Sequence, residues 1–167
     1  MEAPRVYIET TLFNMYFAET RGQYHGKTVG YCRDARRFFE AVEAGEFEPY
    51  TSEIVIGELE ETADKGRRDE MMKLVDDFAI TTLPLDERVK WLADRYIEAG
   101  AIPATQKTDA RHIASATVHG LDFIVSQNFK HIVRDKARRL TAMVNEAEGY
   151  EDIGIYEPGE VIDDGRT

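Results

Sequence analysis

The chain of 167 residues has little cysteine, few prolines and no long apolar run, and these absences exclude several classes of protein. The single cysteine, Cys32, excludes an internal disulfide framework and any zinc site built on a CxxC pair. No apolar stretch approaches the roughly 20 residues that a membrane-spanning helix needs. The N-terminal residues lack the charged and then apolar pattern of a secretory signal, so we expect a cytoplasmic protein.

Basic residues are also scarce, since 21 Lys and Arg stand against 32 Asp and Glu and give a net charge of -11. This balance argues against broad, non-specific duplex binding, which depends on neutralising phosphates. The charge is uneven, however, because residues 107–139 hold seven basic and three acidic residues. That segment is either a local nucleic-acid contact or a solvated helix face. No glycine-rich loop of the GxxxxGK[ST] kind is present, which excludes an ordinary P-loop nucleotide enzyme.

Short β-prone runs alternate with amphipathic helical segments along the chain, a pattern typical of parallel βαβ units. We expect strands near residues 5–8, 47–51, 79–83, 121–126 and 153–156. We expect helices from about residue 12, capped by Thr10 or Thr11, and over 31–44, 53–63, 71–78, 86–100, 109–119 and 129–144, with a loop at 19–30. The prediction is one α/β domain over residues 1–160, with a tail at 161–167. Its architecture is a three-layer α/β/α sandwich around a mainly parallel, roughly five-stranded sheet.

Acidic residues follow the predicted strand ends, where open parallel sheets bind their ligands. The first strand ends at Glu9, the helix after the second carries Glu58, and the helix before the fourth begins at Asp109. Asn128 lies just after the fourth strand. Crowded carboxylates raise one another's pKa values, and oxygen ligands without a Cys or His cluster favour Mg²⁺ or Mn²⁺. Each residue also has a structural interpretation, as a strand end, a solvated helix face, a first-turn acid or a turn residue.

The strings VYIETTLFNMYF, IVIGELEE and TDARHIASATVHGLDFIVSQNFKHI resemble the PIN-domain family, and their order and spacing fit over nearly the whole chain, roughly residues 5–160. VYIETTLFNMYF resembles the family's opening strand, which ends in an acid followed by Thr or Ser. IVIGELEE resembles its second motif, a helix with an inward Glu. TDARHIASATVHGLDFIVSQNFKHI is the most specific, with an Asp opening an Ala-rich helix, then a turn, a strand and a Ser-x-Asn ending.

The resemblance implies an α/β/α fold and an Mg²⁺- or Mn²⁺-dependent ribonuclease. Many such proteins are the toxins of toxin–antitoxin pairs and form dimers, so it also implies RNA, an antitoxin protein and a second copy of the chain as partners. Glu9, Glu58 and Asp109 match the three metal-holding acids. Asn128 stands where many members have a fourth acid. Thr10 and Ser126 match the hydroxyl residues that support the pocket.

Two departures from the family pattern motivate an alternative function. Most members have Asp where this chain has Glu9, and Asn128 carries no charge. The alternative is a weak or inactive PIN-like module that binds RNA or a protein partner. A phosphoryl-transfer enzyme with an aspartate nucleophile is disfavoured, because the first strand ends in Glu9.

Further basic and histidine residues have less specific interpretations. Lys130 and Arg134 are candidates for binding RNA phosphates, or else lie on a solvated helix. The four histidines show no ligand spacing such as HExxH, so we expect His112 to pack or to bond backbone.

Overall fold

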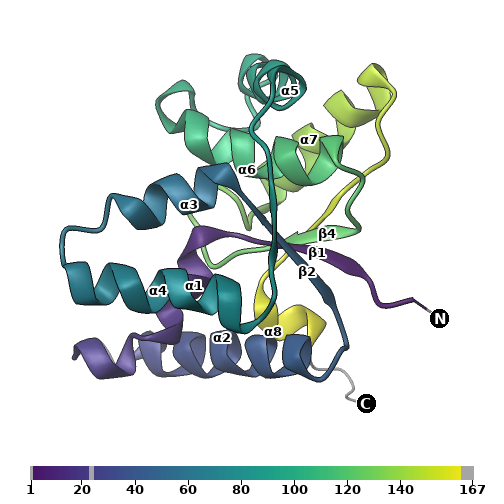
Figure 1. Ribbon diagram of the computed structural model, residues 1–167. Coiled ribbons are helices and arrows are strands. Elements are labelled where there is room, and N and C mark those ends of the chain that lie inside the picture. Colours follow the sequence, from purple (N-terminus) through teal and green to yellow (C-terminus); the bar gives the residue numbers. More distant parts are fainter. Residues whose placement is uncertain (1, 23–24, 163–167) are drawn as a thin grey trace.

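The computed structural model describes residues 2–22 and 25–162, and its centre is a five-stranded sheet (Figure 1). The strands are β1 (Arg5–Ile8), β2 (Glu48–Ser52), β3 (Thr81–Leu83), β4 (Phe123–Val125) and β5 (Gly154–Tyr156). Their order in the sheet is β3-β2-β1-β4-β5, and all neighbouring pairs are parallel. The predicted parallel α/β fold is therefore confirmed.

Helices cover both faces of this sheet. They are α1 (Thr10–Tyr16), α2 (Lys27–Glu43), α3 (Glu53–Glu60), α4 (Lys65–Asp77), α5 (Glu87–Glu98), α6 (Lys107–Val118), α7 (Asp135–Glu148) and α8 (Pro158–Val161). Short 3₁₀ helices span Glu19–Arg21 and Ala104–Gln106. In Figure 1, α2, α4 and α8 lie on one side of the sheet and α5, α6 and α7 on the other. Within the described ranges, no helix is both long and apolar enough to cross a membrane.

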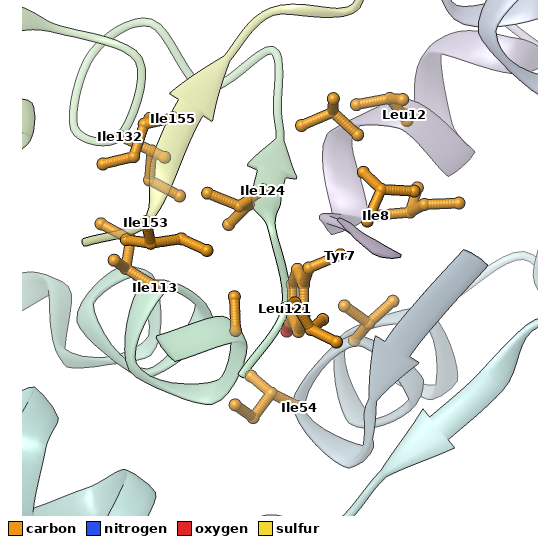
Figure 2. Packing of buried hydrophobic residues seen from close by; sticks show 14 of the residues in the cluster. Tyr7, Ile8, Leu12, Ile54, Ile113, Leu121, Ile124, Ile132, Ile153 and Ile155 are labelled. Carbon is orange, nitrogen blue, oxygen red and sulfur yellow. The ribbon is translucent and has the colours of Figure 1, made fainter. Parts of the chain in front are cut away.

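The core lies on both faces of the central strand β1. Val6, Tyr7 and Ile8 are completely buried, as expected for a strand covered by helices on both sides. Figure 2 shows apolar side chains of β1, β4 and β5 packed together with those of α1, α3 and α6. Apolar burial of this extent is the main favourable term in folding. It also holds the strand ends in a fixed relation to one another.

Register brings the ends of the central strands together. Ile8 pairs with Val125, so the residues that follow, Glu9 and Ser126, leave the sheet side by side. The Glu9 amide donates to the Val125 carbonyl oxygen at 3.1 Å, which extends the pairing past the end of β1. The carboxyl ends of β1 and β4 therefore lie side by side at this edge of the sheet.

Several predicted element ends were wrong. The predicted helix at 129–144 begins only at Asp135, because Asn128 closes a turn before it. The Asn128 carbonyl oxygen accepts from the amides of Ile132 and Val133, and its side chain accepts from the His131 amide at 3.0 Å. Ile132, which lies in this turn, is completely buried.

Three other expectations need correction. Part of the predicted loop is helical, because α2 begins at Lys27. Its N-cap, Gly26, has a positive φ of 58°, which glycine adopts more readily than other residues. The sequence predicted no helix after the fifth strand, but α8 spans Pro158–Val161 and reaches the first residue of the predicted tail. It has a proline in its first turn and a Glu157–Glu160 capping box. Of the predicted 161–167 tail, residues 163–167 lie outside the described residues. The cap of α1 is Glu9 rather than Thr10 or Thr11.

Candidate metal centre

Glu9 is an almost completely buried carboxylate at the end of β1, with 3% of its surface exposed. Its Oε1 accepts from the Thr11 hydroxyl and from the Ser126 hydroxyl, each at 2.6 Å, and from the Thr11 amide. Its Oε2 lies 4.0 Å from Nε2 of His112. Burial raises the pKa of Glu9 against the opposing effects of His112, Ser126 and Thr11. A buried carboxylate of this kind is stabilised by a nearby cation.

Glu58 reaches the same edge from α3, which Ser52 caps by accepting from the Ile54 amide at 3.1 Å. The Glu58 Oε1 accepts from the Thr10 hydroxyl and from Nε2 of His112, the latter at 2.8 Å. Burial acts to raise the pKa of Glu58, but the hydrogen bond and charge of His112, together with Thr10, outweigh it and lower that pKa. Glu58 therefore ionises readily and its side chain is fixed from two sides.

His112 joins the two carboxylates to the core. It is completely buried on α6, and its Nδ1 lies 2.7 Å from the Tyr7 hydroxyl, which in turn lies 2.7 Å from the Ser52 hydroxyl. When Nε2 donates to the Glu58 carboxylate, neutral His112 accepts from Tyr7 at Nδ1. Burial acts to lower the pKa of His112, but Glu58, Glu9 and Asp109 outweigh it and raise that pKa.

Together these three residues form a cluster that could hold a metal ion. One ligand atom each of Glu9, Glu58 and His112 lies within 4.8 Å of the others. Two carboxylates and an imidazole suit a divalent cation, which also relieves the repulsion between the acids. The predicted ligands Glu9 and Glu58 are thus brought together. The third member of the cluster is a nitrogen of His112, which the sequence did not predict as a ligand, and the expectation of oxygen ligands alone stays a prediction.

Asp109 and Asn128 lie beside the cluster rather than within it. Asp109 is buried in the first turn of α6, one turn before His112. Burial raises the pKa of Asp109, while the charge of His112 and a hydrogen bond with the Asn128 side chain oppose the rise. The backbone amide of Asn128 also donates to the Ser126 hydroxyl at 2.9 Å. The role of Asp109 as a metal ligand stays a prediction.

The two candidate RNA-binding residues are not on a helical face. Lys130 is exposed in the turn that Asn128 closes. Arg134 is the residue before α7 and donates from Nη1 to the Lys130 carbonyl oxygen at 3.0 Å. The structure therefore places both on one turn that begins two residues after Ser126. Their contact with RNA remains a prediction.

His112 is the site residue that sequence reasoning missed. No His-rich spacing marks it, and we expected a packing role. One local signal was available, because Asp109 and His112 are three residues apart and share a helix face. Its partners Tyr7 and Glu58 come from other elements and carry no such signal.

No model of a protein family matches the chain, and no curated protein is significantly similar to it.

Proposed function

We propose that this protein is a divalent-metal-dependent ribonuclease that hydrolyses RNA phosphodiesters. The observation that carries the proposal is the buried cluster of Glu9, Glu58 and His112 at the carboxyl edge of a parallel sheet. Binding sites of open α/β sheets lie at this edge. The resemblance of the sequence motifs to PIN domains supplies RNA as the substrate class.

The residues of the site would have different roles in binding the metal. Glu9, Glu58 and His112 would hold Mg²⁺ or Mn²⁺, with Asp109 beside them as a further ligand. A bound divalent cation supplies positive charge for the phosphodiester and lowers the pKa of water. Ser126 and Thr11 fix one oxygen of Glu9, so the other faces His112. Such fixed ligands need little rearrangement on binding, which is the benefit of preorganisation.

Partner expectations belong to the same proposal. An antitoxin protein and a homodimer are proposed on the resemblance alone.

The direct experiment is cleavage of a fluorogenic single-stranded RNA with Mn²⁺ or Mg²⁺, with and without EDTA. We expect cleavage that depends on the metal and falls at least a hundredfold in Asp109→Asn and in Glu58→Gln. Each substitution removes one carboxylate charge from the site and alters little volume.

The matched control is Glu60→Gln, which removes the same charge from an exposed position two residues along α3. Its cleavage rate should equal that of the wild type. Equal residual cleavage in wild type, Asp109→Asn and Glu58→Gln would indicate a contaminating nuclease and contradict the proposal for that substrate.

A non-catalytic binding module is the second candidate, and one observation favours it. Glu58 and His112 hydrogen-bond to each other, and three donors satisfy Oε1 of Glu9, so the cluster is largely satisfied without a cation. The cleavage assay separates the two candidates when it is run beside a calorimetric titration of the protein with Mn²⁺ and a measurement of RNA binding. Mn²⁺ binding or RNA binding without cleavage would support the module.

A further inference from the structure

The two ring nitrogens of His112 face different surroundings. Nε2 faces the carboxylates and lies 2.8 Å from Oε1 of Glu58 and 4.0 Å from Oε2 of Glu9. Nδ1 faces the core and lies 2.7 Å from the Tyr7 hydroxyl, which in turn lies 2.7 Å from the Ser52 hydroxyl. His112, Tyr7 and Ser52 are completely buried, so the contacts on the Nδ1 side are shielded from solvent.

A cation at the cluster changes what the imidazole of His112 needs from its neighbours. Without a cation, the neutral ring donates from Nε2 to Glu58 and accepts from Tyr7 at Nδ1. Nε2 binds a cation only through its lone pair, so the single proton of the neutral ring must then be on Nδ1. This proton needs an acceptor, because an unpaired buried N–H group costs about 1–3 kcal/mol.

Tyr7 and Ser52 are placed to provide that acceptor. A hydroxyl group both donates and accepts, so Tyr7 can donate to Nδ1 in one state and accept from it in the other. When Tyr7 accepts, its own hydrogen can turn to the Ser52 hydroxyl oxygen at 2.7 Å. That oxygen also accepts from the Ile54 amide at 3.1 Å, and its two lone pairs allow both hydrogen bonds. The ring proton therefore moves from Nε2 to Nδ1 without any proton being gained or lost.

We propose that Tyr7 is a positioning residue of the metal centre, which accepts the Nδ1 proton of His112 and so leaves Nε2 free to bind a divalent cation. This role rests on the metal centre of the proposed function and does not require RNA cleavage. A metal-binding histidine commonly has such a partner at its other ring nitrogen. The rings of Tyr7 and His112 also meet edge-on, with centroids 5.8 Å apart, so Tyr7 holds the orientation of the imidazole as well.

The first test is the Mn²⁺ affinity of the whole chain, measured by calorimetry. We expect Tyr7→Phe to weaken Mn²⁺ binding about 10- to 100-fold, the usual effect of losing the partner of a metal-binding histidine. The RNA substrate is not needed for this measurement.

Tyr96→Phe is the matched control, because Tyr96 is also completely buried. Its hydroxyl lies 3.0 Å from the Thr117 hydroxyl and donates to Oδ1 of Asn145 at 2.6 Å, and none of these residues belongs to the cluster. Both variants lose a buried, hydrogen-bonded hydroxyl and therefore stability. The Mn²⁺ affinity of Tyr96→Phe should nevertheless stay within about twofold of the wild type.

A double-variant cycle shows whether Tyr7 acts through His112. In a chain that already carries His112→Gln, adding Tyr7→Phe should change the remaining Mn²⁺ affinity by about twofold or less. An equal loss of affinity with and without His112 would indicate a general loosening of the site and would overturn the role of Tyr7.

A spectroscopic measurement on the wild type covers the case in which Tyr7→Phe does not fold. ¹⁵N NMR of the imidazoles identifies the ring nitrogen that carries the proton, with Zn²⁺ as a diamagnetic probe. The signals of His112 are those missing from His112→Gln. With Zn²⁺ bound, we expect the proton on Nδ1 and the metal at Nε2. A metal at Nδ1 would overturn the role of Tyr7.

The outcomes separate this role from the proposed function. If Tyr7→Phe binds Mn²⁺ as tightly as the wild type, the role is overturned while the proposed metal centre stands. If the wild type does not bind Mn²⁺, the metal centre and the role fail together. Mn²⁺ binding that depends on Tyr7 in a chain that does not cleave RNA would support the role and contradict the ribonuclease.

Discussion

Tyr7 and His112 show how single buried polar residues build the candidate site. Both side chains are completely buried, and the Tyr7 hydroxyl contacts Nδ1 of His112 and the hydroxyl of Ser52. Burial of these groups is tolerated because each has a partner. The chain of contacts connects the cap of α3 to the carboxylates, so the site residues depend on the core for their positions.

Tyr7→Phe removes the hydroxyl and leaves His112 and Ser52 with unpaired buried atoms. We expect a loss of about 1–3 kcal/mol in the free energy of unfolding, measured by urea denaturation. Tyr156→Phe is the control, because Tyr156 is 38% exposed and its variant should lie within about 0.5 kcal/mol of the wild type. Equal stability of the two variants would contradict the assigned hydrogen bonds.

At the sheet edge, Glu9 combines a structural role with the proposed metal-binding one. Glu9 ends β1, caps α1 by accepting from the Thr11 amide, and belongs to the buried cluster. One side chain thus fixes where the helix begins and where a carboxylate oxygen faces His112.

Glu9→Gln and Glu9→Ala separate the two roles of this residue. Gln keeps an oxygen that can accept from Thr11 and Ser126, whereas Ala removes the cap. We expect Glu9→Ala to be less stable than Glu9→Gln by about 1–2 kcal/mol in chemical denaturation. Both variants should lose Mn²⁺ affinity in calorimetric titration. If either variant binds Mn²⁺ with the affinity of the wild type, Glu9 is not a ligand of the proposed metal centre.

The stability of the whole molecule depends on pH through the acids and the histidine of the site, which titrate in different pH ranges. The pKa of His112 is raised from 6.5, so its contribution to stability is fully present below that pH and is lost as pH rises through the raised value. The pKa values of Glu9 and Asp109 are also raised. These two carboxyl groups therefore also lower the stability as pH rises, in a lower pH range than His112. Glu58, with a lowered pKa, adds stability above 4.5 and loses it as pH falls.

In EDTA, the stability advantage of the wild type over His112→Gln should therefore shrink as pH rises from about 6 to about 9. Saturating Mn²⁺ should reverse the trend for the wild type, because a cation competes with protons for the same ligands. Thermal unfolding of both proteins across this pH range measures the effect. A difference between them that does not vary with pH in EDTA would show that His112 does not titrate with the assigned partners.

Local patterns were enough to predict most of the architecture. Apolar residues at helical spacing and short β-prone runs are properties of neighbouring residues, so the alternation of strands and helices could be read directly. The parallel sheet followed from this alternation, and with it the edge at which Glu9 and Glu58 meet. Capping is equally local, since Ser52 caps α3 by accepting from the Ile54 amide two positions away.

Long-range contacts decided what local patterns could not. The late start of α7 depends on a turn closed by Asn128, and the contact of His112 with Glu58 joins residues 54 positions apart. A histidine has the same sequence signature whether it packs, caps or binds a metal. Its role is set by which side chains surround it after folding. Here the packing of α6 against α3 and β1 brought Tyr7, Glu9 and Glu58 to the imidazole, and only the tertiary structure could show this.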